Sequence, residues 1–141
     1  LMAGVTACID YVSKLDPAAT GSRREKIVKS MHAVEKYEQE LFGYLEDNLK
    51  SIPGITLYGK AKDRTPTCYF NFAGVKGADL YKFIASLKVN LPAHNFYALE
   101  VSKALGLGES GAIRAGLAPY STKDDVDRLI SGIKQFLAKA V

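Results

Sequence analysis

Four short runs of β-preferring residues, separated by helical patterns, constrain the fold of this chain most strongly. The runs are GITLYG, PTCYFNFAG, KVNLPAHN and GAIRAGLA, which span residues 54–59, 66–74, 88–95 and 111–118. Glycine or proline bounds or interrupts each run, so the strands that they predict are short. Pro92 has no backbone N–H to donate, and it predicts that the third run is an edge strand or the end of one.

Helical patterns precede, separate and follow the four runs. A capping box of Ser22 and Glu25 marks the start of a long helix, and Thr122 caps the last helix. Helices are predicted at residues 2–12, 22–51, 79–87, 96–106 and 122–137. This order of elements predicts an α+β fold, in which helices pack on a small, mostly antiparallel sheet.

The composition excludes several classes of function. A chain of 141 residues with 48% hydrophobic residues can bury a core as one domain. Its 19 basic residues are interleaved with 15 acidic ones, so the net charge of +4 does not suggest nucleic-acid binding. No apolar run approaches the ~18 residues of a membrane span, and no secretory signal opens the chain. We expect a cytoplasmic protein with neither nucleic-acid nor membrane partners.

Two cysteines stand far apart in the sequence, at Cys8 and Cys68. Their spacing matches no metal-ligand pattern, so no metal site is predicted. Both lie among apolar residues. We therefore expect two buried free thiols and no disulfide.

Arg114 is the charged residue that most needs an explanation, because it stands inside an apolar strand. A guanidinium is costly to bury unless an anion meets it, and the strand contains no acidic residue. Either a remote carboxylate or an anionic ligand must pair with it. From the residues alone the ion pair is favoured, since most arginines pair within their fold.

The other polar candidates are weaker. His94 ends the third run, where it is equally a substrate contact or proton carrier and an ordinary loop histidine. His32 lies within the long helix and is expected at the surface. Asp124 and Asp125 open the last helix, where negative charge complements the helix dipole, and they are not predicted to be a catalytic pair.

Several segments resemble one known family. LGLGESGAIRAGLAPYSTKDDVDRLISGI, residues 105–133, is similar to the end of class V aminotransferases, the family of the cysteine desulfurases and selenocysteine lyases. Residues 33–59 resemble the long helix and first strand of that family's C-terminal domain. NFYAL, which begins at Asn95, matches a subgroup of it. These enzymes use pyridoxal phosphate (PLP) and have the type I fold of PLP-dependent transferases.

The resemblance implies that substrate binding and cofactor binding belong to different domains. Arg114 would bind the carboxylate of an amino-acid substrate, and His94, Asn95 and Tyr97 would form one wall of the site. No catalytic residue is expected here, because the lysine that bonds to PLP belongs to the family's large domain, which would also hold most of the cofactor. Residues 1–15 would be a remaining helix of that large domain, and residues 16–141 the small domain. The whole enzyme would be a homodimer.

One departure limits what activity the resemblance implies. Desulfurases carry a nucleophilic cysteine on a loop near the site, and Tyr97 stands at the matching position. A tyrosine cannot form a persulfide. Lyase, epimerase and transaminase chemistry therefore stay open beside desulfuration. The alternative is a stand-alone α+β module that binds a small molecule or a protein without catalysis.

Overall fold

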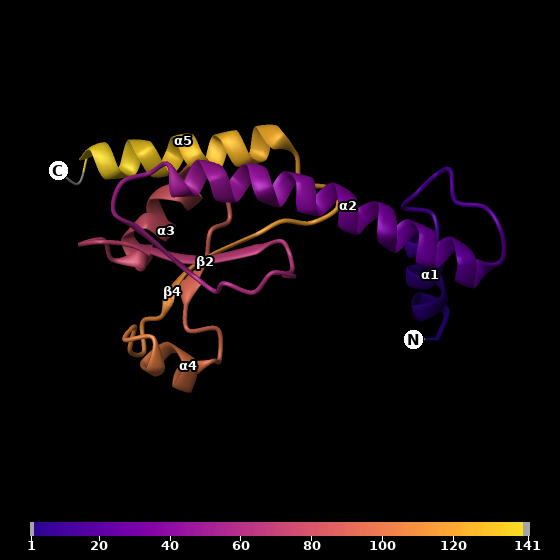
Figure 1. Cartoon of the computed structure of the whole chain (residues 1–141), viewed down its shortest axis with the longest axis horizontal. Helices are drawn as coiled ribbons and strands as arrows, with labels where there is room; N and C mark the ends of the chain where they lie inside the picture. Colours follow the sequence, from indigo (N-terminus) through magenta and orange to yellow (C-terminus); the bar gives the residue numbers. More distant parts are fainter. Residues whose placement is uncertain (1, 140–141) are drawn as a thin grey trace. The chain divides into compact units, whose positions relative to one another are not determined.

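The computed structural model describes residues 2–139 of the chain (Figure 1). Helices and strands follow one another in the predicted order. The elements are α1 (Met2–Val12), α2 (Arg23–Lys50), β1 (Ile55–Tyr58), β2 (Thr67–Phe72), α3 (Gly77–Ser86), β3 (Ala93–His94), α4 (Leu99–Ala104), β4 (Ala112–Gly116) and α5 (Lys123–Lys139). The boundaries differ from the prediction by only a few residues.

The four strands form one antiparallel sheet in the order β1-β2-β4-β3. This confirms the predicted α+β fold and the edge position of the strand that follows Pro92. In the register of β2 and β4, Cys68 lies opposite Ala115 and Tyr69 lies opposite Arg114. Because side chains alternate along a strand, these two neighbouring pairs point to opposite faces of the sheet.

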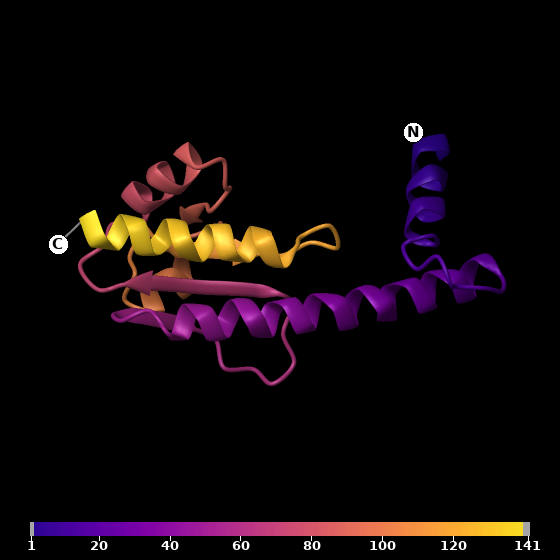
Figure 2. The same ribbon diagram turned by 90° about the horizontal axis from the view of Figure 1, so that it is seen from above.

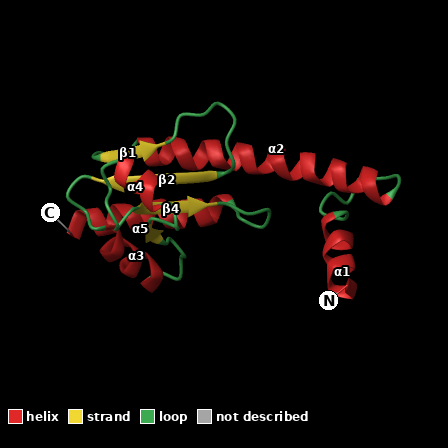
Figure 3. Ribbon diagram, turned by 90° about the horizontal axis from the view of Figure 1, so that it is seen from below, coloured by secondary structure: helices red, strands yellow, loops and turns green. Residues whose placement is uncertain are grey.

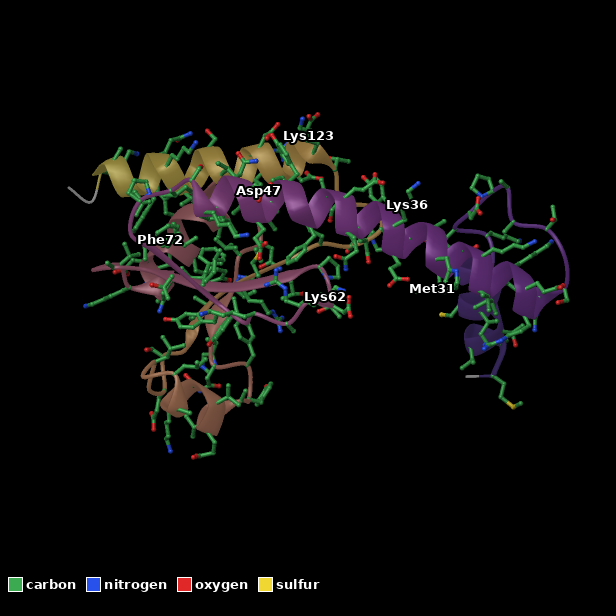
Figure 4. The ribbon with its side chains drawn as sticks, in the orientation of Figure 1. Met31, Lys36, Asp47, Lys62, Phe72 and Lys123 are labelled. Atoms are coloured by element: carbon green, nitrogen blue, oxygen red, sulfur yellow. The ribbon has the colours of Figure 1, made fainter. Side chains whose placement is uncertain are left out.

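One face of the sheet, which we call the helix face, is covered by α3, α5 and the second half of α2 (Figures 1 and 2). Alternate residues of β2 and β4 point into this layer. The fully or nearly buried core there includes Leu45, Leu49, Cys68, Phe70, Phe72, Leu80, Ile84, Ile113, Val126 and Ile133. Phe72 is labelled at the end of β2 in Figure 4. Helix α5 buries Val126, Leu129, Ile130 and Ile133 in the same layer.

Short helix α4 lies on the opposite side of the sheet, which we call the α4 face (Figures 1 and 3). The connection from β3 through α4 returns to β4, so this segment passes over the open side of the strands. A sheet with both faces partly covered by the same chain leaves only a restricted area for polar side chains. That area contains Arg114.

Helix α5 is positioned by a capping box at its start and by a glycine near its middle. Thr122 and Asp125 form a capping box: the Asp125 carboxylate accepts the Thr122 N–H at 2.9 Å, and the Asp125 N–H donates to the Thr122 hydroxyl. Further along, a Cβ on Gly132 would lie 2.8 Å from Ile84 Cδ1 and 3.0 Å from Leu87 Cδ1. Glycine thus permits the close approach of α3 and α5.

The chain divides into two compact units, one ending at Glu40 and the other beginning at Leu41. In the first unit no residue of α1 is buried, although Asp10 forms an ion pair with Arg23 at 2.7 Å. The expected capping box of Ser22 and Glu25 at the start of α2 is present. The predicted division of the chain into residues 1–15 and 16–141 stays a prediction.

Two expectations for the first unit have different outcomes. Cys8 is exposed on α1, so the prediction that both thiols are buried is wrong for this one. The apolar pattern of α1 is a stripe at the surface here, and a stripe of this kind does not by itself bury a side chain. His32 is exposed, as expected. Within residues 2–139, no helix has the length and apolar character needed to cross a membrane.

Candidate functional site

Arg114 lies on the α4 face and is exposed, although its strand neighbours Ile113 and Ala115 are buried. The expectation of a desolvated guanidinium in a buried strand is therefore corrected: β4 is buried on one side only. Among residues 2–139 no carboxylate pairs with Arg114, so the ion pair that the residues alone favoured is not formed there. Instead its Cζ atom lies over the ring of Phe96, 4.0 Å from the ring centroid.

Phe96 reaches this position through an unusual backbone. Phe96 and Tyr97 have positive φ values of 52° and 65°, in the left-handed region that residues with a Cβ adopt rarely. The side chain of Asn95 stabilises the turn through two hydrogen bonds. Its Oδ1 accepts the Tyr97 N–H at 3.0 Å, and its Nδ2 donates to the Glu109 carbonyl at 2.9 Å. These bonds fix the loop between β3 and α4.

Tyr69 forms the floor beside Arg114. Its hydroxyl accepts the Ala112 N–H at 2.8 Å and donates to the His94 carbonyl at 3.2 Å, which joins three strands. Its ring centroid lies 5.7 Å from that of Tyr58 and 6.2 Å from that of Phe96. We name Tyr58, Tyr69, His94, Phe96 and Arg114 the α4-face cluster.

Gly111 allows β4 to begin this close to the loop. Its φ is +64°, and a Cβ there would lie 2.3 Å from the carbonyl carbon and oxygen of His94 and 2.4 Å from the Asn95 nitrogen. Those atoms are backbone and cannot move aside as a flexible side chain would. Glycine at 111 is thus required for the loop to lie against the start of β4.

The predicted site residues are brought together in part. The His94 ring lies edge-on to Phe96 with 6.5 Å between centroids, and His94 Nδ1 is 3.1 Å from Asn95 Oδ1. Tyr97, by contrast, points away and is fully exposed. The structure therefore links Arg114 to His94 through Phe96 and places Tyr97 outside the cluster.

The sequence did not predict Phe96, Tyr69 or Tyr58 as residues of the site. The period-two pattern of β2 could have placed Tyr69 on the face opposite Cys68 and Phe70. Nothing local could have set it against Arg114, because the register of β2 with β4 depends on pairing between distant segments. The left-handed turn at Phe96 contains no glycine, so the sequence does not indicate it.

Cys68 is a poor nucleophile in this environment. It is buried on the helix face, and burial raises the pKa of its thiol from 9.0 to about 11. The thiolate is the reactive form of cysteine, so a pKa this high leaves little of it at neutral pH. Cys68 also points to the side of the sheet away from Arg114.

A cavity of about 340 Å³ lies elsewhere in the second unit, between the approach to β3 and the start of α5. Its floor is apolar, and its polar rim includes Lys88, Asn90, Tyr120, Ser121, Asp125 and Arg128. The charge of Arg128 helps to lower the pKa of Asp125, after the hydrogen bonds from Thr122 that have the larger effect. Of the two cations on that rim, Arg128 already has the Asp125 carboxylate beside it. We therefore place the candidate site at the α4-face cluster.

The α4-face cluster is suited to one kind of chemistry. A guanidinium offers planar N–H donors that match both oxygens of a carboxylate. The surrounding side chains are all aromatic, and the cluster contains neither a lysine nor a thiol. Within the described residues there is no group of three histidine, cysteine or acidic side chains that could hold a metal ion. The arrangement can bind and orient a carboxylate.

Comparison with known proteins defines the class. Residues 4–129 match the family model described as aminotransferase class-V, so the chain belongs to the class V aminotransferase family. It is 34% identical over 134 residues to an uncharacterised protein of Mycobacterium tuberculosis, covering 94% of this chain and 33% of that protein. It is 36% identical over 104 residues to a Staphylococcus aureus protein named "Probable cysteine desulfurase", covering 73% of this chain and 25% of that one.

A solved structure extends the likeness to the fold. The cysteine desulfurase CsdA from Escherichia coli matches with a TM-score of 0.69 and 28% sequence identity, over 86% of this chain and 32% of that one. The predicted α+β fold, that of a fold-type I PLP-dependent transferase domain, is confirmed. The chain spans between a quarter and a third of the length of the relatives that it matches.

Proposed function

We propose that this chain is the substrate-binding part of a PLP-dependent enzyme that acts on an amino acid, and that Arg114 holds the substrate's α-carboxylate. One observation carries the proposal: an exposed guanidinium that no carboxylate of residues 2–139 neutralises, on the face of the sheet away from the core. A planar donor group in such a position binds a carboxylate through two charge-assisted hydrogen bonds. Membership of the class V aminotransferase family supports the same assignment.

The cofactor itself would be held mainly by residues outside this chain. The α4-face cluster contains a single cation, Arg114, and no lysine, so it fits the substrate carboxylate and does not fit covalent attachment of PLP. When bound, PLP withdraws electrons from the α-carbon of an amino acid. The residues of this chain would bind the carboxylate, orient the substrate and exclude water from one side of it.

Other residues of the loop would complete the wall of the site. His94 contacts Asn95 and the Phe96 ring, and the fully exposed Tyr97 side chain projects outward from the same turn, where it would meet the substrate from outside the α4-face cluster. The lack of a cysteine at position 97 favours reactions that need no persulfide. We further propose that the whole enzyme is a cytoplasmic homodimer, as its family resemblance implies. Sedimentation of the whole protein would test the dimer.

The direct test compares two substrates in the longest natural polypeptide that contains this chain. Arg114→Lys keeps the charge and removes the planar fork. We expect kcat/KM for the amino-acid substrate to fall by about 30- to 1000-fold, as for loss of about 2–4 kcal/mol from a paired charge. The corresponding amine without the α-carboxylate should be nearly indifferent to the change. Arg128→Lys, at an exposed position of α5, is the matched control and should leave both substrates unaffected.

Two results would contradict the proposal. Arg114→Lys could reduce turnover of amino acid and amine equally, or it could lower the melting temperature and leave the kinetics of the folded protein unchanged. Either result would assign Arg114 to the fold. The stand-alone binding module would then be favoured, provided that the longest natural polypeptide also fails to take up PLP.

A further inference from the structure

We infer that Phe96 is a positioning residue that holds the Arg114 guanidinium in the orientation needed to receive a carboxylate. This inference rests on the proposed function of Arg114. Its starting observation is the 4.0 Å distance between Arg114 Cζ and the centroid of the Phe96 ring. A ring under the face of a guanidinium attracts the cation and leaves the N–H donors, which lie in its plane, free for a ligand.

The ring of Phe96 is itself fixed from its edges. Tyr69 meets it at an interplanar angle of 74° and His94 at 79°, with centroids 6.2 Å and 6.5 Å away. Such edge-to-face contacts restrict rotation of the ring and leave a face for the guanidinium. Tyr69 is in turn held by its hydrogen bonds to β3 and β4. A chain of contacts therefore runs from the sheet through Phe96 to Arg114.

The backbone supports the same inference. Two successive residues with a Cβ, Phe96 and Tyr97, occupy the left-handed region, which is unfavourable for each of them. Strain of this kind persists where surrounding structure requires it and is concentrated at functional sites. Here Asn95 stabilises the turn, and the turn directs Phe96 onto Arg114 while Tyr97 projects outward.

A role in the core does not explain Phe96. Its side chain is only half-buried, and it is absent from the hydrophobic cluster on the helix face. Its described ring contacts are with residues of the α4-face cluster. An unsupported arginine side chain on an open sheet face would sample many rotamers, and a carboxylate would then have to order it on binding. The ring removes part of that cost.

The first test needs no cofactor. In the 141-residue chain, the ring current of Phe96 should shift the NMR signals of the Arg114 side-chain Hδ and Hε protons upfield. Phe96→Leu keeps an apolar side chain and should return these signals to the position of an exposed arginine. Phe96→Tyr keeps the ring and is the matched control, so its signals should stay shifted. Unshifted Arg114 signals in the unaltered chain would overturn the inference.

The second test measures coupling in the longest natural polypeptide that contains this chain, loaded with PLP. Phe96→Leu should raise KM for the amino acid by about 2- to 5-fold, the range that a cation–π contact at an exposed site supports, and change kcat less. Phe96→Tyr keeps the ring and should leave KM at the value of the unaltered protein. In an Arg114→Gln background, which removes the cation, Phe96→Leu should have almost no further effect, because its influence passes through the guanidinium.

The outcomes separate the two claims. If Arg114→Lys does not discriminate between amino acid and amine, the proposed function itself fails. If Arg114→Lys does discriminate but Phe96→Leu leaves KM unchanged, only the role of Phe96 fails. A Phe96→Leu effect of equal size in the Arg114→Gln background would also overturn it, since Phe96 would then act on the substrate or the fold directly.

Discussion

The two faces of the sheet are built from adjacent residues, but one face forms the core and the other carries the candidate site. On β2 and β4, Phe70 and Ile113 point to the helix face and are completely buried. Their immediate neighbours Tyr69 and Arg114 point to the α4 face, where polar groups remain accessible. One residue along a strand separates a side chain that stabilises the domain from a side chain that can meet a ligand. Stability and binding should therefore respond separately to substitution.

The largest effect is expected on the helix face. Phe70→Ala removes a fully buried ring and should lower the free energy of unfolding by about 3–5 kcal/mol. Arg114→Ala on the opposite face should lower it by no more than about 1 kcal/mol, since it loses only an exposed cation–π contact. Urea denaturation of the 141-residue chain measures both. Equal losses for the two variants would show that the faces are not separable.

The buried thiol gives the helix face a distinct response to pH. Cys68 titrates near 9 in the unfolded chain and at about 11 in the folded one, because burial disfavours the thiolate. The stability is fully present below pH 9 and falls as the pH rises toward 11, since only the unfolded chain then loses the proton. A loss on the order of 2 kcal/mol follows from a shift of this size.

Alkaline unfolding curves of the unaltered chain and of Cys68→Ala would measure this loss. The alanine variant starts from a lower stability, so the slopes between pH 9 and pH 11 are compared and not the absolute values. The slope should be smaller for Cys68→Ala. Identical slopes would mean that the thiol does not titrate as burial requires.

A smaller effect is expected in the loop that serves the α4 face. Asn95→Ala removes the bonds to Tyr97 N–H and the Glu109 carbonyl, and it should lower the free energy of unfolding by about 1 kcal/mol. It should also reduce the ring-current shift of Arg114, because the left-handed turn loses its support. Asn90→Ala, at an exposed asparagine of the preceding connection between α3 and β3, is the control. A stable variant with an unchanged Arg114 shift would contradict the assigned role of Asn95.

The sequence predicted the helices and strands better than it predicted the contacts between them. The Ser22 and Thr122 caps and the apolar face of α5 are local signals, and the structure contains all three. The exposure of Arg114 was not predicted, because GAIRAGLA appears uniformly apolar while its strand is covered on one side only. The arrangement of Phe96 depends on a left-handed turn and on close approach to Gly111, which local patterns do not encode.

The exposed surface of α1 illustrates the same limit. Its apolar spacing predicts a helix, and the helix is present. The apolar neighbours of Cys8 also predict a buried thiol, but Cys8 is exposed. Periodicity indicates which residues share a side of a helix, but burial requires a partner surface that the pattern does not specify.

Mapping where a carboxylate binds tests the assignment of function to the α4 face most directly. The ¹⁵N-labelled 141-residue chain would be titrated with millimolar glycine, with glycinamide, which lacks the free carboxylate, as control. We predict that the largest carboxylate-dependent shifts fall on the Arg114 side chain and on the backbone of Phe96 and Tyr69. Shifts centred instead on Lys88 and Arg128, at the cavity beside α5, would contradict the assignment.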